Sequence, residues 1–295
     1  MTEPALKLAA LRASLDQAAR DAGHANPLVP LGHGAADACL KGGLRQGTVH
    51  EVFAAEASHE AAATGFALTL AARMAGKTRW LLWVRQDFAA LEEGEPYGAG
   101  LVELGLDPSR ILMVRAADAA GVLRATAEGL ATASLGAVVL EPWGEPKLFD
   151  LVTSRRLALA AARTSVTAIL LRPGAEPWPS AAETRWLIRA ARSRDSRDDW
   201  GTPVFDASLV RNRHGTTGQW VMEWNCDDRL FRQAAHSSVV AAASADGPAP
   251  AARAAATSPP GCIRRLYPTG ASKNGRERSK PKTRVHNSQL SGTTA

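Results

Sequence analysis

The sequence predicts an α/β fold in which a mainly parallel β-sheet is flanked by helices and is followed by a C-terminal antiparallel hairpin and a disordered tail. Five β-prone apolar runs begin at intervals of 31, 31, 26 and 29 residues, namely 48–53, 79–84, 110–115, 136–141 and 165–172. The intervals between them contain Ala- and Leu-rich helical stretches at 60–75, 117–132 and 148–163. This period is typical of βαβ units, which place parallel strands side by side under crossover helices.

The first 25 residues predict a separate amphipathic helix. Leu8, Leu11, Leu15 and Ala19 recur at helical spacing, and Pro27 ends the pattern. Charged residues interrupt the pattern, so it lacks the unbroken apolar region of a signal peptide. The chain also lacks the run of about 18 apolar residues that a membrane span needs. We therefore expect a cytoplasmic protein that makes no contact with a membrane.

The pattern changes after Pro173. A Pro-containing loop covers 174–182, and 184–193 has the composition of either a strand or a short helix. Two β-prone runs at 205–213 and 219–224 then flank a Gly-bounded turn, which is typical of a hairpin. We therefore expect antiparallel strands added to the parallel core, within one domain that spans 26–234.

The positive charge of the chain is concentrated in its tail. Residues 236–295 hold nine basic and two acidic residues, whereas the first 235 residues hold 26 basic and 27 acidic ones. The body is therefore nearly neutral, which argues against a basic nucleic-acid-binding fold. The composition of 235–295 predicts disorder. This tail either attaches to DNA or an acidic partner, or is an extension without a function.

Cysteines give no sign of a covalent or metal framework. Cys39, Cys226 and Cys262 are far apart and form no C-x-x-C pair. We therefore predict free thiols and no metal site.

The segment 41–74 has the order Gly-rich turn, strand, loop and helix, which is where P-loop ATPases hold the phosphates of their nucleotide. Such a cradle needs glycines that turn backbone N–H groups towards the phosphates, a Lys for the β- and γ-phosphates, and a Ser or Thr for Mg²⁺. No glycine occurs between Gly47 and Gly65, and no Lys or Arg between Arg45 and Arg73.

The loop from Ala54 to Thr64 carries the opposite charge to the one that a cradle requires. Glu56 and Glu60 lie in this loop, and both carboxylates repel a triphosphate. We therefore predict a degenerate phosphate loop, no nucleotide binding and no cofactor.

Two separated motifs resemble one protein family. GGLRQGTVHEV at 42–52 resembles the Gly-Gly-Leu lead-in of RecA-type proteins, and 103–143 follows the strand, helix and acidic-ended strand order of that fold. Together with RNRHGTTGQWVMEW at 211–224, this lead-in resembles the ImuA family, RecA-like accessory proteins of bacterial damage-inducible mutagenesis that are also related to the SulA division inhibitors. The resemblance covers roughly 26–232 and leaves the tail out.

The resemblance implies a RecA-like domain in 26–234 and a non-enzymatic role in SOS-induced mutagenesis. Members of this family act with ImuB, a catalytically inactive relative of Y-family polymerases, and with an error-prone DnaE-type polymerase in translesion synthesis past damaged DNA. RecA and single-stranded DNA are further candidate partners. The alternatives are an ATP-dependent recombinase-like protein with an atypical phosphate loop and a SulA-like inhibitor of cell division.

Several polar residues lie at the ends of the predicted elements. Glu141 matches the position of the Mg²⁺-directing carboxylate in RecA-like folds, and without a phosphate cradle we expect it to be an inherited residue exposed at the sheet edge. His50 and Glu51 lack both a nucleophile and the HExxH spacing, so we expect Glu51 to anchor a hydrogen-bond network and His50 to pack beside it. His59 and Glu60 are expected at the start of a helix.

The hairpin carries a candidate surface for a partner or for DNA. Arg211 and Arg213 are two residues apart and therefore share one face of a strand, as do Trp220, Met222 and Trp224 on the returning strand. Arg with interleaved aromatics is the composition of a platform for single-stranded nucleic acid. The alternative is that the Trp face is buried and the two Arg are solvated or face a partner.

A second candidate region is the Arg-rich stretch at 184–200. Arg189 and Arg192 line one side of this stretch if it is helical, and they join the candidate partner or DNA surface. One alternative is a solvated surface segment of mixed charge. The resemblance to RecA relatives offers another, a mobile loop at a DNA channel.

Overall fold

The computed structural model describes residues 26–144, 147–172, 174–193 and 201–234. The predicted N-terminal helix (1–25), the predicted disordered tail (235–295) and Cys262 lie outside these residues. Within them, Cys39 and Cys226 are free thiols, and no helix is long and apolar enough to cross a membrane.

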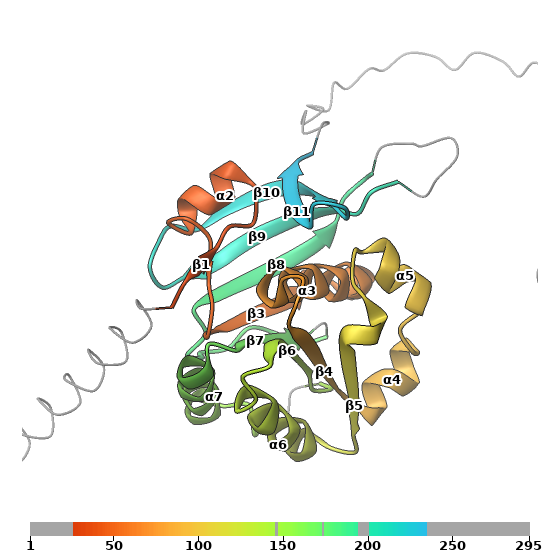
Figure 1. The fold of residues 1–295 in the computed structure, drawn as a ribbon, viewed down its shortest axis with the longest axis vertical. Coiled ribbons are helices and arrows are strands. Elements are labelled where there is room, and N and C mark those ends of the chain that lie inside the picture. The colour runs from red at the N-terminus through yellow and green to blue at the C-terminus, as the bar shows by residue number, and fades with distance from the viewer. Residues whose placement is uncertain (1–25, 145–146, 173, 194–200, 235–295) are drawn as a thin grey trace, which may run out of the picture. The chain divides into compact units, whose positions relative to one another are not determined.

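The described residues form one large β-sheet and a small second one (Figure 1). The order of the large sheet is β11-β10-β9-β8-β3-β7-β6-β4-β5. The bounds of its strands are β3 (Val49–Ala54), β4 (Trp80–Gln86), β5 (Ile111–Ala116), β6 (Leu135–Glu141), β7 (Thr167–Arg172), β8 (Thr184–Ala190), β9 (Val204–Asn212), β10 (Gly218–Asn225) and β11 (Leu230–Gln233). The small sheet pairs β1 (Leu28–Val29) with β2 (Leu44–Arg45).

The strands from β5 to β8 in this order are parallel to their neighbours, whereas β8, β9, β10 and β11 pair antiparallel. The five predicted strands are β3 to β7, so the predicted parallel core is confirmed. The predicted hairpin is confirmed as β9 and β10. β11 was not predicted because a four-residue strand that contains Arg and Gln has no clear alternation.

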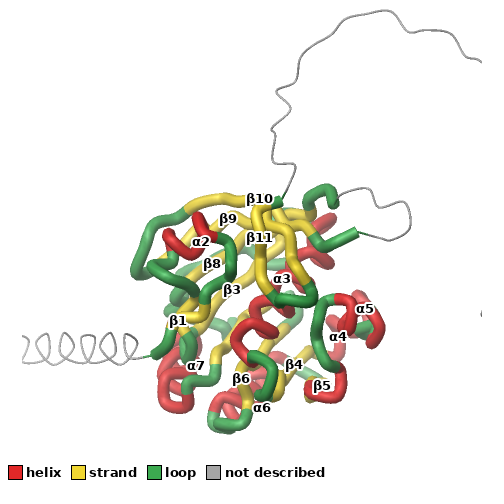
Figure 2. Tube along the Cα trace, turned by 45° about the horizontal axis from the view of Figure 1, so that its top comes forward, coloured by secondary structure: helices red, strands yellow, loops and turns green. Residues whose placement is uncertain are grey.

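Helices cover both faces of the parallel part of the sheet (Figures 1 and 2). The helices of the described residues are α2 (Gly34–Cys39), which lies against β10 in the antiparallel part, and α3 (Glu60–Ala75), α4 (Asp87–Glu93), α5 (Gly98–Glu103), α6 (Ala119–Leu130) and α7 (Leu151–Thr164). The three predicted helices are α3, α6 and α7, whose ends differ from the prediction by at most three residues. The sequence did not reveal α2, α4 and α5, because six or seven residues are too few to show a helical period.

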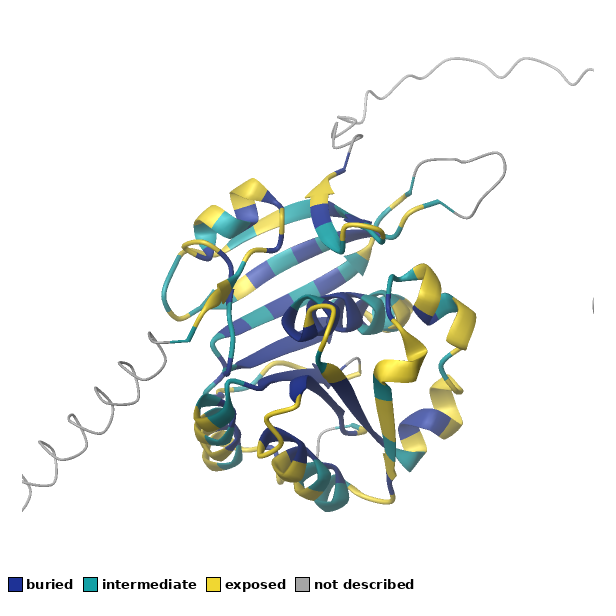
Figure 3. Ribbon diagram, viewed as in Figure 1, coloured by how far each residue is buried: buried dark blue, intermediate teal, exposed yellow. Residues whose placement is uncertain are grey.

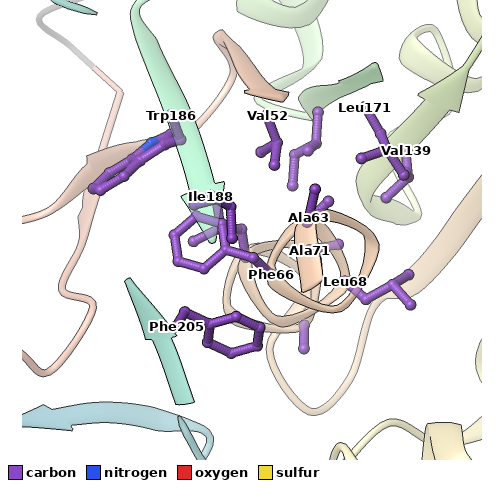
Figure 4. Packing of buried hydrophobic residues seen from close by; sticks show 14 of the residues in the cluster. Val52, Ala63, Phe66, Leu68, Ala71, Val139, Leu171, Trp186, Ile188 and Phe205 are labelled. Atoms are coloured by element: carbon purple, nitrogen blue, oxygen red, sulfur yellow. The ribbon is translucent and has the colours of Figure 1, made fainter. Parts of the chain in front are cut away.

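α3 is buried on most of its surface because Ala, Leu and Phe cover nearly all of its faces. Phe66 packs against Trp186 and Phe205, with ring centroids 5.4 and 5.5 Å apart (Figure 4). At the other end of the helix, a side chain on Gly136 would place its Cβ only 2.2 Å from the Cα of Ala75. The glycine therefore lets β6 pass close beneath α3.

The opposite face of the sheet packs against α6 and α7, which enclose a second apolar cluster. Each helix begins with an Asp cap. Asp118 accepts a hydrogen bond from the N–H of Gly121 at 2.6 Å, and Asp150 accepts one from the N–H of Thr153 at 2.8 Å. Caps of this kind stabilise a helix by about 1 kcal/mol each.

β8 joins the parallel and antiparallel parts of the sheet. Its burial alternates, since Thr184, Trp186 and Ile188 are buried while the residues between them are half-buried (Figure 3). This two-residue period is that of a strand with one face on the core. The part of 184–193 that forms a regular element is therefore a strand, not a helix.

Candidate functional site

The carboxyl ends of β3, β4, β6 and β7 meet at one edge of the sheet, because these strands are parallel. Ligands of open α/β sheets bind at this edge. Here it carries the loop from Ala54 to α3 and three charged strand ends, Arg85, Glu141 and Arg172.

The loop after β3 is a compact turn tied to the neighbouring strand β8. Residues Ala57–His59 form a 3₁₀ turn that leads directly into α3. Ala55 donates its N–H to the carbonyl of Ile188 at 2.9 Å, and His59 Nδ1 accepts the N–H of Ala190 at 3.3 Å. The predicted places of His59 and Glu60 at the start of α3 are confirmed. Glu60 stands where a phosphate would meet the positive end of the helix dipole.

Glu141 is not exposed at the sheet edge as we expected; its side chain is only 1% exposed. Its Oε2 accepts hydrogen bonds from Arg85 Nε and Trp83 Nε1, each at 2.8 Å, and its Oε1 accepts one from Arg85 Nη2 at 3.1 Å. A carboxylate of this kind is stable when buried only because charge and hydrogen bonds compensate for its lost hydration. Both oxygens are therefore engaged inside the protein.

A second carboxylate shares the same guanidinium. Glu93, at the end of α4, lies with Oε2 3.0 Å from Arg85 Nη2. Burial, a hydrogen bond to Glu141 and the negative charge of Glu141 raise the pKa of Glu93 to about 7. Arg85 Nη1 also donates to the carbonyl of Gly94 at 2.8 Å. These contacts hold the end of α4 against the sheet edge.

Arg172 is the last residue of β7 and lies at the carboxyl ends of the parallel strands. Its side chain is buried, its Nη2 donates to the carbonyl of Gly144 at 3.1 Å, and its guanidinium lies 4.2 Å from the ring centroid of Trp178. This arginine therefore joins the loops that follow β6 and β7. Cation–π contacts of this type gain strength when they are removed from water.

Sequence reasoning did not single out Arg85, Glu93 or Arg172. One signal was present: Arg85 and Glu141 lie at equivalent ends of two apolar strands, which is the pattern of a cross-strand ion pair. Nothing in the sequence states that these two strands are neighbours.

His50 and Glu51 occupy the amino half of β3 and have structural partners. His50 Nδ1 lies 2.8 Å from Thr184 Oγ1, and burial lowers the pKa of the ring. Arg185 donates from Nε to Glu51 Oε2 at 2.7 Å. The predicted hydrogen-bond network around Glu51, with His50 packed beside it, is confirmed.

The structure does not bring the arginines and tryptophans of the hairpin together. Trp220 and Trp224 face the α3 side of the sheet, where Trp220 lies 6.3 Å from Trp186 and Trp224 lies 4.8 Å from Phe231 between ring centroids. Trp224 is 0% exposed and donates its Nε1–H to the carbonyl of Leu104 at 3.0 Å. A surface position for Trp224 is therefore wrong, because the sheet register turns this face into the core.

Arg211 lies on the other face of the sheet. Its backbone is paired with that of Arg185, whose neighbour Trp186 points into the core. Burial lowers the pKa of Arg211, and repulsion from Arg185 and Arg213 adds to this effect, while Glu51 and Glu183 oppose it. Arg213 follows the end of β9 and is exposed. The structure thus assembles a cluster of Arg185, Arg211 and Arg213, which we call the arginine cluster.

Arg189 and Arg192 belong to the opposite end of β8. Arg189 shares a face with Arg185 but is four residues away, which is about 13 Å along a strand. Its Nε lies 4.0 Å from Glu56 Oε1, and Arg192 is exposed beyond the strand. The two residues do not line one side of a helix, because this part of the chain is β8 and the segment that follows it.

The fold and the site define an α/β protein with a mainly parallel sheet flanked by helices. The place at the carboxyl ends of its strands, where such folds bind ligands, is occupied by an internal network of carboxylates and guanidiniums. The chain is 29% identical to Protein ImuA of Caulobacter vibrioides, strains NA1000 / CB15N and ATCC 19089 / CIP 103742 / CB 15, over 216 residues that cover 67% of this chain and 83% of each relative. No protein-family model matches the sequence. The similarity supports the assignment of the chain to the ImuA family that its motifs indicate.

Proposed function

We propose that this chain is a non-enzymatic accessory protein of damage-inducible mutagenesis, which supports error-prone translesion DNA synthesis in the cytoplasm. Its similarity to Protein ImuA and the two motifs at 42–52 and 211–224 support this role. A fold that retains its sheet without a phosphate cradle still offers a rigid surface for partners.

One observation carries the non-enzymatic part of the proposal. Glu141, at the position of a Mg²⁺-directing carboxylate, is already bound by Arg85 and Trp83. To serve a metal it would have to leave Arg85 as a buried charge without its main partner, which costs about 3–5 kcal/mol. Glu56 in the loop before α3 and Glu60, the first residue of α3, add carboxylates that repel phosphate.

Titration calorimetry of the full chain with ATP and Mg²⁺ tests this part. We expect no saturable binding, while a P-loop ATPase measured alongside gives a normal isotherm. Saturable micromolar binding, with nucleotide and Mg²⁺ found between the end of β3 and the first turns of α3 in a soaked crystal, would show an ATP-dependent recombinase-like protein instead.

The proposed partners are an ImuB-type polymerase relative and an error-prone DnaE-type polymerase, with RecA and single-stranded DNA as further candidates. The arginine cluster supports a contact with an anionic surface, because Arg185 and Arg213 both repel the guanidinium of Arg211, and Glu51 and Glu183 oppose this repulsion. Within the cluster, Arg185 is already paired with Glu51 at 2.7 Å, so Arg211 and Arg213 would meet the partner. Co-purification with the ImuB-type protein, for the full chain and for a chain truncated after residue 235, tests the partnership. We expect both forms to co-purify. Loss of binding on truncation would place the contact in the tail, and filamentous cells with normal mutagenesis on overexpression would favour the SulA-like alternative.

A further inference from the structure

One of the two outer strands of the large sheet is β5, at the opposite end from β11. Among the described strands β5 pairs only with β4, so its other side has no strand partner in these residues (Figure 1). Leu112 and Met113 in the middle of β5 are 48% and 37% exposed. Sheet edges are usually protected by proline, bulges or several charges. β5 contains Arg115 as its single charged residue and no proline.

An apolar groove of about 490 Å³ runs beside this edge, between the strands and α6. Trp80, Leu82, Leu112 and Val114 line its sheet side, and Ala125 and Gly129 its helix side. A side chain on Gly129 would clash with Leu82, so the glycine sets how closely α6 approaches the sheet. A strand added to β5 would place every second side chain next to Leu112 and Val114 on the groove side.

The amino end of this edge is basic. A small cavity there is lined by Lys77, Arg79, Arg110 and Arg229 together with one carboxylate, Asp107. The arginines donate to backbone carbonyls: Arg79 Nη2 to Met74 at 2.9 Å, Arg110 Nη1 to Thr78 at 2.7 Å and Arg229 Nη1 to Gly76 at 3.1 Å. Carbonyls hold the guanidiniums in place without neutralising them. Asp107 lies with Oδ2 3.6 Å from Arg110 Nε, so this cavity has four cations and one carboxylate among its lining residues.

We propose that the β5 edge is a docking site for an extended segment of a partner protein, with acidic residues at one end and apolar residues at alternate positions. The segment adds to the sheet as a further strand, its apolar side chains occupy the groove beside α6, and its acidic end meets Arg110 and Lys77. Strand addition of this kind obtains affinity from main-chain hydrogen bonds and specificity from alternate side chains. The proposal does not depend on the role in mutagenesis.

Selection of a displayed random library of peptides of about 12 residues, longer than a typical strand, on the full chain tests the proposal. We expect enrichment of peptides with acidic residues at one end and alternating apolar residues. Their affinity should fall at least about tenfold, or about 1.4 kcal/mol, for Leu112→Lys and for Arg110→Glu. Leu159→Lys on α7 and Arg232→Glu on β11 are matched controls of similar exposure and should leave affinity unchanged.

Amide hydrogen exchange on the unmodified chain keeps the test independent of how the variants fold. The selected peptides should slow the exchange of amides within 111–115. The proposal fails if no peptide is enriched, if enriched peptides lack the acidic and alternating pattern, or if the β5 amides are not protected. It also fails if the chain forms a dimer that Leu112→Lys abolishes, because a second copy would then occupy the edge.

Discussion

Arg85 on β4 and Glu141 on β6 are paired in register, and the guanidinium of one donates two hydrogen bonds to the carboxylate of the other at 2.8 and 3.1 Å. The two residues are almost completely buried, with side chains 3% and 1% exposed. The pair fills the place where a nucleotide-binding α/β protein would keep a carboxylate available for a metal ion. It joins β4 to β6 and, through Glu93, fixes α4 to the sheet.

Breaking this pair should destabilise the protein strongly. Glu141→Gln leaves the buried Arg85 without its main counter-charge, and we expect the free energy of unfolding to fall by about 3–5 kcal/mol. Urea denaturation measures the change. Glu128→Gln, on the exposed side of α6, is the control and should change stability little. The paired substitution Arg85→Met with Glu141→Leu should regain most of the loss, and equal losses in the single and paired variants would contradict the assignment.

The raised pKa of Glu93 predicts a specific pH dependence. Because this pKa is about 7 in the folded protein instead of 4.5, the folded state binds more protons than the unfolded chain between these values. Stability should therefore fall as pH rises through this window. Glu93→Gln removes the titrating group, so its melting temperature relative to the unmodified chain should rise with pH there. Glu92→Gln is the neighbouring control, and an identical pH profile for Glu93→Gln would show that Glu93 titrates normally.

The arginine cluster should contribute to binding of an anionic partner. Arg211→Glu with Arg213→Glu should reduce retention of single-stranded DNA, or capture of the ImuB-type protein, by about tenfold at low salt, with a weaker effect at high salt. Filter binding and pull-down measure the two effects. Arg232→Glu provides a charge reversal on a different strand and should have little effect. If the double variant binds as the unmodified chain does, the arginine cluster is not part of the interface. If Arg189→Glu with Arg192→Glu loses binding instead, the interface lies at the other end of β8.

Trp224 should matter for stability and not for binding. Trp224→Ala opens a cavity between β10 and Phe231, and we expect a loss of about 3–5 kcal/mol in unfolding free energy. Trp224→Phe keeps most of the packing and should fold. A folded Trp224→Phe protein that no longer retains DNA or partner would contradict the buried, structural role.

Local patterns were enough to predict the five parallel strands, three helices and the hairpin. The faces of the hairpin were predictable only within a regular stretch of one strand, where residues two apart share a face. The pairing of β8 with β9 is shifted between Arg185 and Trp186, so Arg211 does not lie on the face of Leu209, two residues before it. Which face of β9 matches which face of β10 depends on register. The pairing of Trp220 with Ala207 and of Arg211 with Arg185 put tryptophans and arginines on opposite faces. Residue spacing alone therefore could not show whether one face of the hairpin combines arginines with tryptophans.

The sequence by itself determined where the parallel strands lie and that the loop after the first of them has no Lys, no Arg and no glycine for a phosphate, since the absence of a residue type needs no coordinates. Only the tertiary structure shows that an ion pair between two strands occupies the place of the missing phosphate site. Arg85 and Glu141 are 56 residues apart, and they meet only because β4 inserts between β5 and β6. The same strand order leaves β5 at the rim of the sheet, with its apolar side chains uncovered among the described residues.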